Sequence, residues 1–250
     1  MQAEMTMQSP AARVAAWLEQ LDGNRRACLD WMHPSWLPAW LLDGTVGESL
    51  RDADDACANA LVQLLELPSV DAFDTYATWQ TCASRDAWAR NVLAFATLPI
   101  DWQRRLLRLR ALVFRRGEVR RIVDLMRRSR LAALLGEQAT PLLRWLAQLP
   151  GAPDVATLSR AIGMPGLDAL DDDALEWEGF CLLERDGVLA NDAAAQWLRR
   201  ALPRELDVPI WLARCERAVD ADGSAHVLSR LPELFPEPAW SFGCDIPTSN

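Results

Sequence analysis

Apolar residues recur near the start of the chain with the spacing of an α-helix. Val14, Trp17 and Leu21 follow one another at intervals of three and four residues, which places them on one helical face. The dipeptide Ser9–Pro10 is a typical start signal, because serine caps a helix and proline fits its first turn. Glycine is common just past helix ends, so Gly23 is the predicted end of this helix.

The same spacing predicts helices along most of the chain. They are expected over residues 52–66, 71–82, 84–97, 101–126, 140–149, 155–162, 171–183, 192–202 and 209–219. Convincing alternation of apolar and polar residues, the pattern of a β-strand, is absent. The predicted fold class is therefore all-α, a multi-helix globular protein. One exception is left open, because Arg185–Val188 contains turn-forming residues that favour a minor β-hairpin near 183–190. The pattern does not decide whether Gly117 breaks the helix over 101–126.

Prolines divide the chain into three expected regions. Two prolines and a glycine within residues 150–153 stop a helix. They separate a helical N-terminal and central region, 1–149, from an acidic helical region, 154–231, that we expect to pack on it. Residues 232–250 form a Pro-rich tail. No apolar run approaches the roughly 18–20 residues of a membrane span, and the polar N-terminus does not resemble an export signal. We therefore expect a cytoplasmic protein.

Charge is distributed unevenly along the chain. All 26 basic residues are arginine and the net charge is −9, a balance that disfavours general nucleic-acid binding. Eleven arginines and three acidic residues lie between Asp101 and Arg130, so this segment carries +8 and the rest of the chain −17. The arginines either pair internally with carboxylates of the second half, or form an exposed basic face for an acidic protein partner. A nucleic acid or an anionic membrane surface is the third interpretation.

Tryptophans gather in a second segment. Trp31, Trp36 and Trp40 lie within ten residues and are separated by two prolines, so this segment cannot form one regular helix. Their side chains either fill the core from an ordered loop or anchor another protein, because tryptophan is enriched at binding hot spots. His33, beside Pro34, is expected to cap or pack rather than to bind a metal.

Motifs of catalytic or cofactor chemistry are missing from the sequence. The two histidines, His33 and His226, are far apart, and the six cysteines are scattered without a C-x-x-C pair. We therefore predict no metal site and no cofactor, and a protein that is not an enzyme. An enzyme whose catalytic carboxylates cannot be picked out among the many acidic residues is kept as an alternative.

One stretch of the second half has the pattern of a DNA-binding turn. Residues 156–164 place small, apolar and glycine residues as a helix-turn-helix does. The helix that follows would present Asp171–Asp173 and Glu176 to the phosphates, and negative charge there opposes DNA binding. A helical regulatory protein with a degenerate helix-turn-helix is therefore the alternative function, and no nucleic-acid partner is expected.

The Arg-rich segment is similar to a known family. Residues 98–145 resemble the central segment of the SctK/YscK proteins of bacterial type III secretion systems, through Leu106–Phe114, Gly117–Val123 and Leu131–Gly136. The shared pattern is an apolar helix, a Gly-Glu-apolar-Arg-Arg step and a Leu-rich helix. Residues 28–38 are similar to the His-Pro and Trp-Leu-Pro segment near that family's N-terminus.

The resemblance implies a non-enzymatic scaffold or adaptor of the sorting platform, cytoplasmic and peripheral to the inner membrane through the secretion apparatus. Its partners would be the cytoplasmic domain of the inner-membrane ring protein SctD and the pod protein SctQ, which carries the stator and the ATPase. The candidate partner-binding residues combine the tryptophan segment with the arginines of the Gly-Glu step: Trp31, His33, Trp36, Trp40, Arg115, Arg116, Arg120 and Arg121.

Overall fold

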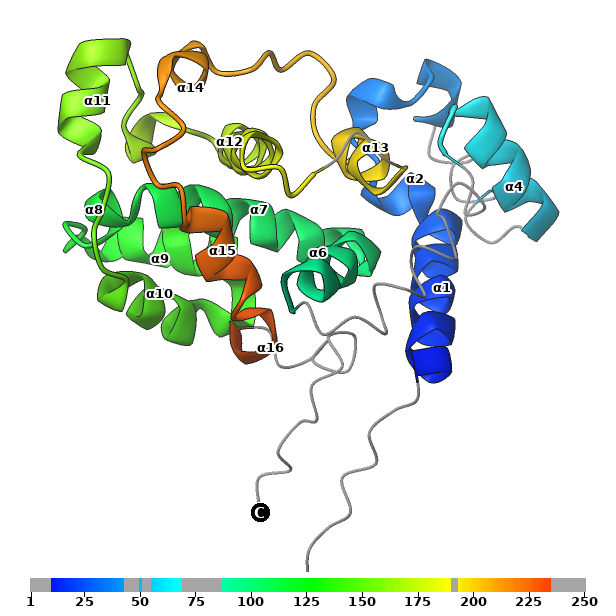
Figure 1. The fold of residues 1–250 in the computed structure, drawn as a ribbon. Helices are drawn as coiled ribbons and strands as arrows, with labels where there is room; N and C mark the ends of the chain where they lie inside the picture. Colours follow the sequence, from blue (N-terminus) through cyan, green and yellow to red (C-terminus); the bar gives the residue numbers. More distant parts are fainter. Residues whose placement is uncertain (1–9, 43–49, 51–54, 69–86, 190–192, 235–250) are drawn as a thin grey trace, which may run out of the picture. The chain divides into compact units, whose positions relative to one another are not determined.

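A computed structural model describes residues 10–42, 50, 55–68, 87–189 and 193–234, and within them the fold is helical without a strand (Figure 1). The all-α prediction is confirmed. Packing groups the chain into two compact units, each discontinuous in sequence. Unit 1 is drawn from residues 1–103, 191–204 and 228–250, and unit 2 from residues 104–190 and 205–227. Each unit contains residues from before and after the 150–153 boundary. The sequence-based division instead used the contiguous stretches 1–149, 154–231 and 232–250.

Unit 1 is organised around an apolar core that its tryptophans help to build. Its helices are α1 (Pro10–Arg26), α2 (Cys28–Trp31), α4 (Asp55–Leu64), α6 (Ala87–Thr97), α13 (Ala193–Arg200) and α16 (Leu231–Leu234). Leu21, Trp31 and Trp197 are buried together in this core. α1 begins at Pro10, as predicted, but continues through Gly23 to Arg26. A glycine inside a helix costs only about 1 kcal/mol. The next turn is held by Asn24, which is buried and donates to the carbonyl oxygen of Leu98, and by the ion pair of Arg25 with Asp22.

The tryptophan segment has the irregular backbone that its prolines predict. After α2 the chain forms two short 3-10 turns, Pro34–Trp36 and Ala39–Leu41. The predicted helix over residues 71–82 and the predicted cap at Ser84 lie outside the described residues. So does most of the Pro-rich tail, from residue 235 onward.

Unit 2 contains most of the Arg-rich segment and most of the acidic half. Its helices are α7 (Ile100–Phe114, from Arg104 onward), α8 (Arg116–Val119), α9 (Leu125–Leu135), α10 (Ala139–Gln148), α11 (Val155–Ile162), α12 (Asp172–Arg185), α14 (Ile210–Arg214) and α15 (Gly223–Leu228). Aspartate caps set three of the N-termini. Asp124, Asp154 and Asp171 each accept a hydrogen bond from a backbone N–H three residues later, which satisfies a donor that the first turn leaves unpaired.

The predicted helix over residues 101–126 is interrupted. α7 ends at Phe114, α8 contains Gly117, and α9 starts afresh after Asp124. The breaks therefore fall at Arg115 and at residues 120–124, and Gly117 itself lies inside α8. This restart changes which side chains face the core: Val123 and Met126, two apolar residues of the predicted helix, are 85% and 78% exposed.

α12 is the central helix of unit 2 and is buried on all sides from Leu175 to Leu183. A recognition helix must reach into a DNA groove, so this burial argues against the helix-turn-helix alternative. α12 also continues to Arg185, and Gly187 then turns the chain with a φ of +74°. The minor hairpin expected near 183–190 is therefore wrong for the described residues, because helix occupies the place of its first strand.

Close packing of α12 against α7 depends on a single glycine. A Cβ added to Gly179 would lie 1.9 Å from the carbonyl oxygen of Leu107 and 2.5 Å from its carbonyl carbon. Both are backbone atoms of α7, so no side chain can move aside. The two helix backbones can approach this closely only because residue 179 has no side chain.

We predict that Gly179→Ala destabilises the protein by about 3 kcal/mol, the upper end of the usual range, since overpacking against backbone forces the helices apart. The matched control is Gly166→Ala, where the nearest atom to an added Cβ is a side-chain oxygen of Glu118 at 3.7 Å. Urea unfolding followed by tryptophan fluorescence measures both variants. Equal stability of the two would show that α7 and α12 do not pack as described.

Candidate interaction surfaces and a buried arginine network

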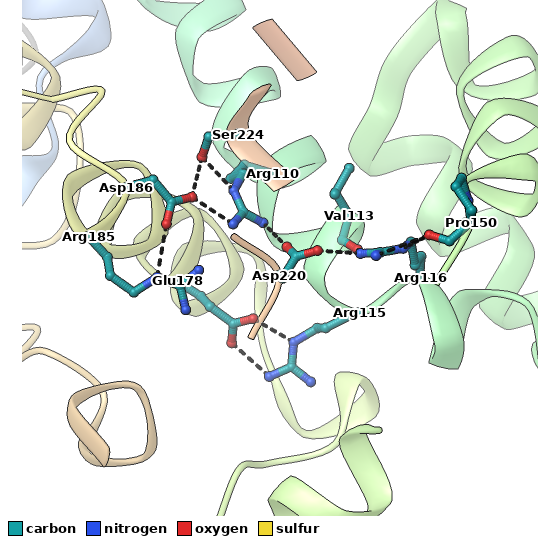
Figure 2. Close-up of polar contacts among 10 residues, drawn as sticks. All are labelled: Arg110, Val113, Arg115, Arg116, Pro150, Glu178, Arg185, Asp186, Asp220 and Ser224. Carbon is teal, nitrogen blue, oxygen red and sulfur yellow. Dashed lines mark hydrogen bonds and ion pairs between the residues drawn. The ribbon is translucent and has the colours of Figure 1, made fainter. Parts of the chain in front are cut away.

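Arg110 of α7 is the centre of a buried polar network in unit 2 (Figure 2). Its side chain is fully buried, and each of its three nitrogens donates one hydrogen bond. Nε donates to Ser224 Oγ, Nη1 to Asp220 Oδ2 and Nη2 to Asp186 Oδ2, each over 2.8 Å. Ser224 Oγ in turn donates to Asp186 Oδ2 over 2.5 Å. The guanidinium is thus held by two separate segments of the unit, the end of α12 and residues 220–224.

Asp220 joins Arg110 to a second arginine. Its Oδ1 accepts a hydrogen bond from Nη1 of Arg116 over 2.6 Å, while Oδ2 accepts from Arg110. Arg116 also donates to the carbonyl oxygens of Val113, at 2.7 Å, and Pro150, at 3.3 Å. Asp220 has a φ of +62°, a left-handed conformation that costs about 1 kcal/mol or more. Its two ion pairs compensate for that strain.

Arg115 forms the second buried pair, with Glu178 of α12. Nε and Nη2 donate to the two carboxylate oxygens of Glu178, each over 2.7 Å, in the bidentate geometry that arginine favours. Nη1 donates to Glu118 and to the carbonyl oxygen of Pro165. Burial alone lowers the pKa of Arg115, but its hydrogen bonds and the negative charges of Glu178 and Glu118 raise it above the usual value. The side chain therefore stays charged.

In a third pairing, two arginines of α7 share one buried carboxylate of α12. Glu176, fully buried on α12, accepts from Nε of Arg104 over 2.7 Å and from Nε of Arg108 over 2.6 Å. The internal interpretation of the charge asymmetry is therefore correct for five arginines: Arg104, Arg108, Arg110, Arg115 and Arg116. Their carboxylates come from the acidic half of the chain.

Of the four arginines predicted to bind a partner, two are buried in these pairs and two are exposed. Arg115 and Arg116 lie inside unit 2, so neither side chain is available as a surface contact, and for these two the expected docking role has no structural support. Arg120 and Arg121 are exposed. Arg120 hydrogen-bonds the carbonyl oxygen of Leu149 at the end of α10, whereas the side chain of Arg121 has no partner among the described residues.

Sequence reasoning missed the surface that follows them. Val123, Leu125 and Met126 are each more than three-quarters exposed. Arg127, Arg128 and Arg130 are exposed beside them. We call residues 120–130 the 120–130 surface. Asp124 was the available signal, since an N-cap at that position restarts the helix and turns Leu125 and Met126 outward.

Unit 1 separates the three tryptophans into three environments. Trp31 is buried and stacks on Trp197 with ring centroids 6.2 Å apart, so it is a core residue. His33 accepts a hydrogen bond from the N–H of Ser35, which confirms the expected capping role. Trp40 is half exposed, next to the equally exposed Leu42. Among Trp31, Trp36 and Trp40, only Trp40 is exposed.

Trp36 lies between these extremes. It is partly buried, and its Nε1 donates to the carbonyl oxygen of Leu202 over 2.8 Å. Three arginines, Arg199, Arg200 and Arg204, lie within 5.3 Å of its ring centroid, a favourable cation–π arrangement. Burial and the nearby Arg204 lower the pKa of Arg200, against the opposing charge of Glu66. Trp36 thus organises a basic cluster of unit 1.

The described part of the chain holds no group of three or more His, Cys, Asp or Glu residues placed to bind a metal ion. No helix in the same ranges is both long enough and apolar enough to span a membrane. The buried polar groups of unit 2 are satisfied mainly by one another.

The described ranges are thus all-α, with internally paired buried arginines and with exposed aliphatic side chains beside exposed arginines. The family model for the bacterial type III secretion protein HrpB4 matches residues 8–237. The chain therefore belongs to this family, and the type III secretion resemblance predicted from residues 28–38 and 98–145 is confirmed. No curated protein and no solved structure matches the chain.

The network makes a pH-dependent prediction for Asp186. Burial alone raises its pKa, but Arg110, Ser224 and Arg185 together lower it below the ordinary value. A lowered pKa stabilises the fold above the unfolded-state value of about 3.9, and this stabilisation is lost as pH falls through the folded-state pKa. Asp186→Asn should therefore cost about 1.5–3 kcal/mol at pH 7, and its difference from the wild type should shrink below pH ~4.

Urea unfolding at several pH values between neutral and acid measures this difference. Asp168→Asn is the matched control, because Asp168 is 59% exposed and pairs with the exposed Arg127 over 3.0 Å. Such surface pairs contribute about 0–1 kcal/mol. A stability gap for Asp186→Asn that stays constant down to acid pH would contradict the assigned role of its charge.

Proposed function

We propose that this protein is a non-enzymatic adaptor of a type III secretion system that links the inner-membrane ring to the pod and ATPase of the sorting platform. Its partners are the cytoplasmic domain of the ring protein SctD and the pod protein SctQ, and its place is the cytoplasmic side of the inner membrane. The observation that carries the proposal is the family match over residues 8–237, which assigns the chain to type III secretion.

The distribution of exposed chemistry supports a linking role. Each unit has its own surface with apolar and basic side chains. In unit 1 this is Trp40 and Leu42, with the arginine cluster around Trp36. In unit 2 it is the 120–130 surface. A linker must hold two partners at once, and two such surfaces on different units provide that capacity.

The buried network supports a structural rather than a catalytic role. Carboxylates that act as general acids or bases must reach a substrate. Glu176, Glu178 and Asp186 are instead occupied by arginines within the protein. These three buried carboxylates are therefore poor candidates for the catalytic residues of an enzyme.

A bridging experiment tests the proposal. Tagged cytoplasmic domain of the ring protein is immobilised, and the pod protein is applied with or without the full chain. We expect the pod protein to be retained only when the chain is present. The double variant Trp40→Ala with Leu42→Ala should reduce capture of one of the two partners. It should keep its stability within about 0.5 kcal/mol, as is usual for exposed positions.

Deletion and complementation in bacteria provide the second measurement. Loss of the gene should abolish secretion, and the wild-type chain should restore it. The proposal is wrong if the chain captures neither partner. It is equally wrong if secretion continues without the gene, or if a turnover lost on a single carboxylate substitution accounts for the phenotype.

A further inference from the structure

The 120–130 surface lies beside a groove in unit 2. A cavity of about 300 Å³ is lined by residues of the α8–α9 connection, of α9 and of the turn before α12: Ile122, Met126, Arg127, Arg130, Leu131, Leu134, Leu167 and Asp168. Leu131, Leu134 and Leu167 are buried and form an apolar floor. Met126 is exposed and borders the same space. The groove can therefore accept apolar side chains from outside.

Arginines dominate the surroundings of this groove. Arg120, Arg121, Arg127, Arg128 and Arg130 are exposed along the 120–130 surface. The carboxylates close to them are few: Asp124 caps α9, and Asp168 and Asp172 pair with Arg127 and Arg130. Both pairs are exposed, at 3.0 and 3.6 Å, and contribute little to stability. Positive charge on this surface is therefore largely available to a partner.

We propose that the groove and the 120–130 surface bind an acidic amphipathic helical segment of a partner protein. Apolar side chains on one face of that segment would contact Val123, Leu125 and Met126 and enter the groove. Glu or Asp on its flanks would pair with the arginines. This is the helix-in-groove mode of recognition, in which anchors recur every three or four residues. The inference rests on the proposed function only in expecting the segment to come from the secretion apparatus.

The charges around the groove favour a protein segment as its occupant and disfavour an anionic membrane. Asp168 lies on the rim of the groove and Asp172 beside it, where a continuous negative surface would be repelled. A peptide can place a neutral or basic residue opposite these two carboxylates and acidic residues opposite the arginines. A concave apolar floor also suits inserted side chains, whereas membrane-bound amphipathic helices present a convex apolar face to the lipid.

The surface is held in place before a partner arrives. Arg116 and Arg120 tie α8 to the carbonyl oxygens of Pro150 and Leu149. Arg128 donates to the carbonyl oxygen of Ile122 over 3.1 Å, which closes the connection between α8 and α9. Preorganised side chains lose less entropy on binding, so a short segment can bind with useful affinity.

The test uses the full chain and a fluorescent synthetic helix of about 15 residues, with leucines on one face and glutamates on its flanks. We expect saturable binding by anisotropy. Two double variants, Leu125→Glu with Met126→Glu and Arg120→Glu with Arg121→Glu, should each weaken binding at least about tenfold, as loss of hot-spot residues does. Arg160→Glu, an exposed arginine on α11, is the matched control and should bind normally.

Folding of the variants is checked by circular dichroism melts. Leu125 and Met126 lie in the first turn of α9, where negative side chains favour the helix, so unchanged melting is expected. A peptide with lysines in place of glutamates should bind the Arg120→Glu/Arg121→Glu variant better than the wild type. Such a swap would support direct charge contact, and its absence would contradict it.

Other occupants give different results. The proposal is overturned if phosphatidylglycerol vesicles bind the wild type through these residues while the peptide does not. It is also overturned if the wild type dimerises through them, or if nothing binds. The bridging experiment, repeated with the Leu125→Glu/Met126→Glu variant, separates the two proposals. If this variant bridges normally, the binding role of the 120–130 surface is refuted and the adaptor proposal stands. If the wild type bridges nothing, only the adaptor proposal is refuted.

Discussion

Burial of arginine guanidinium groups is the constraint on which the structure of unit 2 depends. A buried charge without a partner costs several kcal/mol, so Arg110 and Arg115 can be fully enclosed only where carboxylates meet them. Their partners sit on α12 and on the segment before α15, far from α7 in sequence. The network therefore fixes which segments come together. Its net contribution to stability is smaller than its number of hydrogen bonds suggests, because desolvation offsets most of the attraction.

Much of this fold is predictable from the sequence because helical spacing and aspartate caps are local signals. α11 spans the predicted residues, and Asp154 and Asp171 begin their helices where a capping residue precedes an apolar run. Internal charge pairing was one of three interpretations of the +8 between Asp101 and Arg130, and the charge count alone did not choose among them. What the spacing cannot supply is the identity of each pair. That depends on the crossing of α7 with α12, a tertiary property without a sequence period.

The candidate site was only half visible in the sequence for the same reason. Arg115, Arg116, Arg120 and Arg121 look equivalent along the chain. In the structure the first two adjoin the end of α7 and turn inward, and the last two follow α8 and remain outside. Exposure of Leu125 was hidden because an apolar residue in helical spacing is usually part of a core. The cap at Asp124 restarts the helix and thereby changes its face.

One group of arginines pairs with carboxylates inside the protein, and the other group is exposed on the 120–130 surface. Arg108 and Arg110 on α7 and Arg115 just after it have carboxylates of this chain within 2.6 to 2.8 Å and are already satisfied. Those on the 120–130 surface have weak, exposed partners or, for Arg121, none in the described part of the chain. Bidentate pairing with Glu178 fixes the orientation of Arg115, and Arg116 ties the start of α8 to Asp220 and to the carbonyl oxygen of Pro150. The exposed arginines of the 120–130 surface are hydrated, whereas Val123, Leu125 and Met126 leave apolar area in water. Covering that apolar area is favourable, and the proposed acidic segment would do so while pairing with arginines that have no strong partner in the described part of the chain.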